Sequence, residues 1–107
     1  MPILGYAYSP VSADTLLTSE PAFLGGLVVL ASVDGGDVTL YDGLDAGSGR
    51  LIGRFEGLAN VSNPIIFPDA VPLDRGLFVD VGSNITEVLL LWRPLSDVEA
   101  RVVRQPS

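Results

Sequence analysis

The stretch AFLGGLVVLASVDGGDVTLYDG, residues 22–43, decides the fold class of this chain. The apolar run Leu27–Val33 and the alternating segment Val38–Tyr41 both have the pattern of a β-strand. Between them lie Gly35 and Gly36, and glycine readily adopts the positive φ values that a two-residue hairpin turn requires. The stretch therefore predicts one long antiparallel hairpin, with its two strands paired to each other.

A second segment, GLFVDVGSNITEVLLLWR at residues 76–93, weakly resembles the first and predicts a second hairpin. A two-residue turn would place Asp80 opposite Glu87, so we expect a loop of three or five residues. The run Val88–Trp92 is apolar at every position. It should be a central strand that is covered on both sides, or covered on one side and capped by a partner on the other.

The sequence between the two segments is less regular. Residues 42–49 are mostly small and acidic and predict a surface loop. Arg50–Phe55 alternates as a half-exposed strand with Leu51 and Phe55 on one face. Residues 57–75 contain prolines at 64, 68 and 72. Because proline cannot donate a backbone hydrogen bond, this region predicts at most a short edge strand.

Turn signals about every 8 to 12 residues indicate an all-β fold, either a two-sheet antiparallel sandwich or a jelly-roll-like barrel. With 107 residues the chain should form one domain. We place this β domain at residues 22–94. Residues 1–21 predict an extended N-terminal arm with one or two short strands, and residues 95–107 predict a C-terminal arm or a short helix.

Apolar side chains spaced along the two arms suggest contacts with a neighbouring subunit. The tyrosines at 6 and 8 could equally pack on their own domain. The predicted contact residues, which would act as apolar anchors, are Tyr6, Tyr8, Leu16, Leu17, Leu95, Val98 and Val102.

The composition restricts the chemistry available to this chain. It has no lysine, histidine or cysteine, and its net charge is −7. Catalysis by a thiolate, an imidazole or an amine is therefore impossible, and an enzyme could use only paired carboxylates. The six arginines are scattered along the sequence, whereas a nucleic-acid-binding surface needs clustered basic residues. No apolar stretch approaches the roughly 18 residues that a membrane span requires. We expect no enzyme activity, no cofactor, no nucleic-acid partner and no membrane partner.

Four aspartates, at positions 34, 37, 42 and 45, raise a calcium hypothesis because hard cations bind several oxygens from one loop. Their spacing matches no EF-hand, and aspartate is also a common turn residue. We therefore expect no metal site.

Several ordered motifs resemble those of small all-β virion proteins of tailed bacteriophages. The motifs are Tyr-x-Tyr-x-Pro at 6–10, Ser-Ala-Asp-Thr at 12–15, Phe-Leu-Gly-Gly-Leu at 23–27, Thr-Leu-Tyr-Asp at 39–42 and Gly-Leu-Phe-Val-Asp-Val at 76–81. The resemblance implies a capsid decoration (cement) protein or another minor head protein, with no catalytic residues. Its partners would be the major capsid protein and further copies of itself, commonly as a homotrimer. It would be made in the bacterial host cytoplasm and would lie on the outer surface of the capsid.

Two other functions are compatible with the sequence. One is a carbohydrate- or ligand-binding β module displayed on a virion, which would use exposed aromatic residues or a calcium loop. The other is a tail or neck component, which a low copy number per virion would distinguish from a decoration protein.

Overall fold

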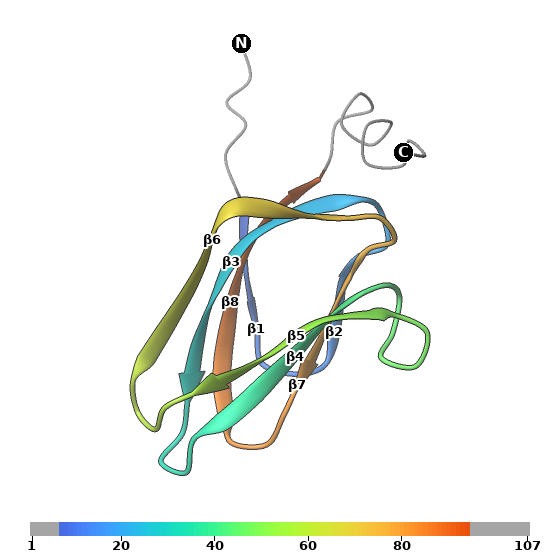
Figure 1. The fold of residues 1–107 in the computed structure, drawn as a ribbon. Helices are drawn as coiled ribbons and strands as arrows, with labels where there is room; N and C mark the ends of the chain where they lie inside the picture. Colours follow the sequence, from blue (N-terminus) through green and yellow to red (C-terminus); the bar gives the residue numbers. More distant parts are fainter. Residues whose placement is uncertain (1–6, 95–107) are drawn as a thin grey trace.

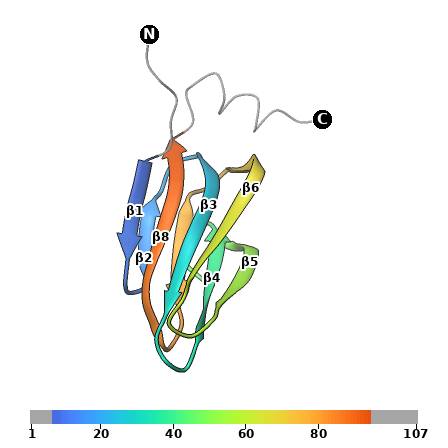
Figure 2. The ribbon, with the colours of Figure 1, turned by 90° about the vertical axis from the view of Figure 1, so that its left-hand side faces the viewer.

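A computed structural model describes residues 7–94, which form two antiparallel four-stranded sheets packed face to face (Figures 1 and 2). This confirms the predicted all-β, two-sheet antiparallel sandwich. Sheet A has the strand order β1-β8-β3-β6, and sheet B has the order β2-β7-β4-β5. The strands of sheet A are β1 (Ala7–Val11), β8 (Ile85–Pro94), β3 (Ala22–Ala31) and β6 (Ser62–Leu73). The strands of sheet B are β2 (Thr15–Thr18), β7 (Leu77–Val81), β4 (Gly36–Asp42) and β5 (Arg50–Gly57).

The core lies between the sheets and is built from alternate residues of the central strands. These inward side chains are aliphatic and almost fully buried, which is the main source of stability for a chain without disulfides. They include Leu24, Leu27, Val29, Val38, Leu40, Leu77, Val79, Val88 and Leu90.

The predicted hairpin at residues 22–43 is wrong in its pairing. Its two strands exist, but β3 belongs to sheet A and β4 to sheet B, so the turn at Gly35 carries the chain across the core. Both strands bury one face in the same core, and this gives the same alternating pattern that a flat hairpin would have. The sequence pattern alone therefore did not separate the two arrangements.

The second predicted hairpin is corrected in the same way. Strands β7 and β8 are joined by a three-residue connection, which has one of the two expected lengths, but they too lie in opposite sheets. Residues 22–43 and 76–93 each cross from sheet A to sheet B or back, and we call them the two crossing segments. They pair with each other: β3 pairs with β8, and β4 pairs with β7. Their connections lie at the same end of the sandwich (Figure 1).

Backbone hydrogen bonds join these two connections. The N–H of Ser32 donates to the carbonyl of Asn84 at 2.7 Å, and the N–H of Gly82 donates to the carbonyl of Asp37 at 3.0 Å. The weak similarity between the two segments thus corresponds to an equivalent structural role, since each links sheet A to sheet B.

Strands β4 and β5 form a hairpin that was not predicted, with the loop 43–49 between them. In that loop Asp45 accepts hydrogen bonds from both the backbone N–H and the hydroxyl of Ser48. An irregularity in the pairing near Ile52 reverses the alternation of β5. Phe55 and Ile52 therefore both pack against the core, whereas Leu51 is exposed. The prediction that Leu51 and Phe55 share one face is wrong.

Strand β6 lies at an edge, as its prolines indicate, but it has 12 residues and is not short. Pro64 and Pro72 lie opposite Val28 and Phe23 of β3, and Pro68 lies where the register shifts. An edge strand tolerates proline because only one side of its backbone pairs with a neighbour. The prolines restricted the position of this strand in the sheet rather than its length.

The N-terminal boundary of the domain is earlier than predicted. Strand β1 pairs with β8, and β2 pairs with β7, so residues 7–18 supply one edge strand to each sheet. These residues are part of the sandwich and not part of an arm. Residues 1–6 and 95–107, including the predicted C-terminal arm or helix, lie outside the described residues.

Candidate protein-interaction surfaces

Strand β8 is apolar on both faces, as its sequence indicates. Val88 and Leu90 point into the core and are fully buried, whereas Leu89 and Leu91 alternate with them and point outward. Sheet B covers only the inner face (Figure 2). Within residues 7–94, no strand covers the outer face of sheet A.

The neighbouring strands continue this apolar outer surface. Each outward leucine of β8 lies in a cross-strand row that spans all four strands of sheet A. One row consists of Tyr8, Leu91, Gly26 and Ile66, and the next consists of Pro10, Leu89, Val28 and Pro64. We call these two rows, together with Phe23, Leu30, Glu87 and Arg93 at their borders, the A face.

Exposure shows that the A face is a surface rather than a second core. Tyr8 is 68% exposed and Ile66 is 60% exposed. The solvent-facing side of an antiparallel sheet is normally polar, and contiguous exposed apolar patches mark sites of interaction. The A face therefore has the composition of a protein-interaction surface.

The two borders of the A face differ in charge. At one border the Arg93 guanidinium lies over the Phe23 ring, 4.5 Å from its centroid, which is a cation–π contact. At the other border Glu87 pairs with Leu30 across the strands. A shallow depression of about 160 Å³ adjoins this acidic border and is lined by Val28, Leu30, Ser62, Glu87 and Leu89.

Sheet B carries a narrower apolar feature on its own outer face. Leu16, Phe78, Tyr41 and Leu51 are cross-strand neighbours and form one row over all four strands, which we call the B row. The rings of Phe78 and Tyr41 are 6.4 Å apart. Leu16 is 42% exposed and Leu51 is 60% exposed, so the B row is accessible at both ends.

Charged groups border the B row. Arg54 donates from Nε to the Asp37 carboxylate at 2.8 Å and forms an ion pair with it, and this contact raises the pKa of Arg54. Asp14 accepts a hydrogen bond from the N–H of Val81 at 2.8 Å. Burial raises the pKa of Asp80, and the nearby Asp14 carboxylate raises it further. The B row thus has aromatic residues at its centre and a polar border, as many protein interfaces do.

The predicted contact residues are separated by the fold. Tyr8 lies on the A face and Leu16 lies in the B row, on opposite sides of the sandwich. Leu17 is partly buried and packs against the core. The remaining predicted contact residues lie outside the described part of the chain, and these are Tyr6, Leu95, Val98 and Val102.

Most of the A face was not predicted as a contact site. The apolar pattern on both sides of β8 was the available signal, and a partner on one side was one of the two arrangements that it predicted. The outward residues of β3 and β6 had no such signal, because β3 was paired with the wrong strand and no partner was predicted for β6.

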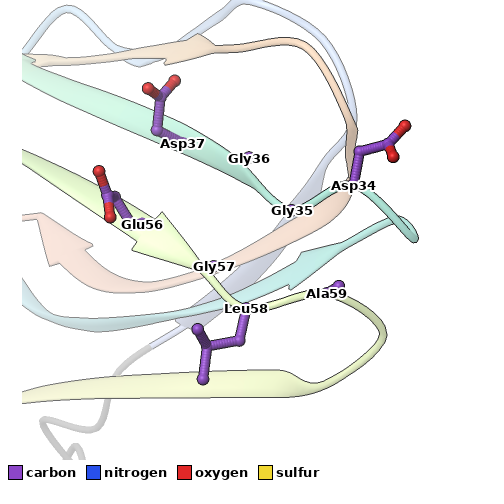
Figure 3. Close-up of a pocket in the computed structure, with 8 residues that line it drawn as sticks. All are labelled: Asp34, Gly35, Gly36, Asp37, Glu56, Gly57, Leu58 and Ala59. Atoms are coloured by element: carbon purple, nitrogen blue, oxygen red, sulfur yellow. The ribbon is translucent and has the colours of Figure 1, made fainter.

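The aspartates of the calcium hypothesis are not brought together. Asp34 and Asp37 border an open recess of about 420 Å³, in which the side chain of Asp34 points away from those of Asp37 and Glu56 (Figure 3). Asp42 lies at the other end of β4, and Asp45 bonds within its own loop. Among the described residues, no three acidic side chains are grouped so that they could hold a metal ion.

Trp92 packs against the core, and its indole N–H donates to the Ser9 hydroxyl at 3.1 Å. It is therefore not an exposed platform for a sugar ring.

Comparison of this chain with protein-family models, with curated proteins and with solved structures found no match. No helix long and apolar enough to cross a membrane occurs in residues 7–94. The geometry of the two outer faces is therefore the basis for the functional proposal.

Proposed function

We propose that this chain is a non-enzymatic structural protein of a bacteriophage virion, which lies on the outer surface of the capsid, binds the major capsid protein and stabilises the shell. The observation that carries the proposal is the presence of apolar side chains on the outer faces of both sheets. A free-standing sandwich needs neither of them. The assignment to a virion comes from the resemblance of the sequence motifs.

Two opposed interaction surfaces suit a protein that links other proteins together. One surface would allow binding to a single partner, whereas two surfaces allow one copy to bridge two neighbours. Many such bridges around a shell would add up to a large stabilisation even if each contact is weak. This is the mechanical requirement for a cement protein.

We assign the capsid contact to the B row. Interfaces commonly use buried aromatic side chains as anchors and a surrounding border of charged groups. Tyr41 and Phe78 supply the aromatic centre, and the Arg54–Asp37 pair supplies part of the border. The role of each apolar residue is to fill a pocket on the partner and exclude water, with no covalent chemistry.

The test is binding of the purified protein to capsid shells of the phage that encodes it, prepared without this protein. Wild-type protein should bind in hundreds of copies per shell, as measured by quantitative mass spectrometry. A handful of copies at one vertex would indicate a tail or neck component, and the absence of binding would contradict the proposal.

A matched pair of variants tests the assignment to the B row. Leu51→Asp places a charge at the exposed end of the row and should weaken binding about tenfold or more, equivalent to about 1.4 kcal/mol. Leu58→Asp is the control, because Leu58 is 70% exposed and lies outside both apolar surfaces. Equal binding of both variants would show that the capsid contact lies elsewhere.

A further inference from the structure

We infer that the A face binds the A face of a second copy of the same chain. The two copies would be related by a two-fold axis that lies between their A faces and runs perpendicular to the strands of sheet A. This inference concerns self-association and does not depend on the chain being a capsid protein. Four features of the A face support it: the edges around it, the order of charges along β8, the sizes of the side chains in its rows, and its area.

The edges of sheet A do not favour pairing with a strand of another chain. Its edge strands are β1 and β6. The first contains Pro10 and the second contains three prolines, which cannot donate to an incoming strand. An apolar sheet whose edges are blocked in this way can associate more readily through its face.

The outward residues of β8 have an order that is complementary to itself. They run Glu87, Leu89, Leu91 and Arg93, with opposite charges at the two ends and leucines between them. When two copies stack with their β8 strands antiparallel, Glu87 of each copy meets Arg93 of the other. The leucines meet leucines at the centre. A partner of unrelated sequence would not require opposite charges at equal distances from the middle of the strand.

The same two-fold axis brings each cross-strand row against its complement. The row of Leu91 meets the row of Leu89 in the other copy, so Gly26, which has no side chain, lies opposite Val28. Phe23 of one copy lies opposite Leu30 of the other, beside the shallow depression at the acidic border. Large side chains thus face small ones or a hollow at these positions, which favours close packing.

The area of the A face sets the expected affinity. Four strands about 4.8 Å apart, over about seven residues of about 3.3 Å each, give roughly 450 Å² per copy. Two copies would bury roughly 900 Å², which is below the roughly 1,200 Å² of stable interfaces and within the range of weak, transient ones. The dimer should therefore be reversible and should depend on protein concentration.

Sedimentation velocity over a wide concentration range tests this inference. Wild-type protein should show a monomer–dimer equilibrium. Protein that stays monomeric at the highest attainable concentration would overturn the inference, and so would a trimer, which the resemblance to phage decoration proteins implies.

Charge reversal tests the predicted geometry. Glu87→Arg and Arg93→Glu should each weaken dimerisation about tenfold or more, because the two-fold axis creates two like-charge contacts in either variant. The double variant should return the dissociation constant to within about threefold of wild type, since the pairs are re-formed in reverse order. Glu56→Arg on sheet B is the control and should have no effect. A dimer that is insensitive to both single reversals would overturn the face-to-face arrangement.

Cross-linking provides a readout that does not rely on stability. The chain has no cysteine, so Glu87→Cys and Arg93→Cys each introduce a single reactive thiol. A short bis-maleimide should join the two variants when they are mixed. Neither variant should cross-link to itself, because equal positions lie about 20 Å apart along the antiparallel strands. Efficient self-cross-linking of Glu87→Cys would exclude the antiparallel stacking.

Discussion

The backbone N–H of Arg75 donates a 2.8 Å hydrogen bond to the carboxylate of Asp42, the last residue of β4. The other carboxylate oxygen accepts the N–H of Asp74 at 3.1 Å. Asp42 is only 8% exposed, and these two donors replace the water that its charge has lost. This carboxylate therefore ties the connection between β6 and β7 to the end of the β4–β5 hairpin.

Asp42→Ala should lower the free energy of unfolding by about 1–3 kcal/mol, because two backbone N–H groups would lose their acceptor. Asp42→Asn should lose less, since its amide oxygen can still accept. Urea denaturation followed by circular dichroism measures the effect. Asp45→Ala is the control, because Asp45 is exposed and bonds only within its own loop. A loss for Asp45→Ala as large as that for Asp42→Ala would contradict this role of Asp42.

Gly36 is a site where the two crossing segments approach each other too closely for a side chain. A Cβ atom at this position would lie 2.5 Å from the Ser83 carbonyl oxygen. Gly36→Ala should therefore displace the backbone and destabilise the protein by about 1–3 kcal/mol, as measured by thermal or urea unfolding. Gly47→Ala is the matched control, because its nearest contact would be an ordinary 3.5 Å. Unchanged stability of Gly36→Ala would show that the connections can separate without cost.

The hydrogen bond between Trp92 and Ser9 holds the edge strand β1 to the centre of sheet A. Trp92→Phe and Ser9→Ala each remove it, and a double-mutant cycle isolates its contribution from the change in side-chain volume. We expect a coupling energy of about 0.5–1.5 kcal/mol in urea denaturation. A coupling energy near zero would mean that water replaces the bond at no cost.

The sequence was sufficient to predict the fold class and the central strands β3, β4, β7 and β8, but not which strands pair. The alternation of apolar residues in β3 and β4 indicates that each strand buries one face. The same alternation is expected whether the two strands lie side by side or on opposite sides of a core. Gly35 and Gly36 allow either a hairpin or a crossing, because positive φ and close approach can serve both. Pairing is decided by contacts distant in sequence, such as the hydrogen bond from Ser32 to Asn84.

The candidate surfaces were predictable only where the apolar pattern of a single strand was sufficient to indicate them. Val88–Trp92 is apolar at every position, and this alone indicated a strand that needs cover on both faces. Of the B row, only Leu16 was a predicted contact residue. The row as a whole could not be predicted, because its four residues come from four strands and become neighbours only through the register. A single residue of such a row has no distinctive local pattern.

Asp80 should make the stability of the protein depend on pH in a defined direction. Burial and the nearby Asp14 carboxylate raise the pKa of Asp80 above 3.8, so the folded protein binds this proton more tightly than the unfolded chain does. Stability should therefore fall as the pH rises from about 4 through the raised pKa of Asp80. Asp80→Asn removes the charge and can still hydrogen-bond to Asp14, so it should melt at a higher temperature than wild type at pH 7.

The difference in melting temperature between Asp80→Asn and wild type should shrink as the pH is lowered towards 4, where Asp80 of the wild type also becomes neutral. Differential scanning calorimetry at several pH values measures this. Asp69→Asn is the control, because it removes the same charge from an exposed position in β6 and should show no comparable gain. If Asp80→Asn is less stable than wild type at pH 7, the Asp80 carboxylate makes a favourable contact in the folded state, and the repulsion from Asp14 is not the dominant interaction.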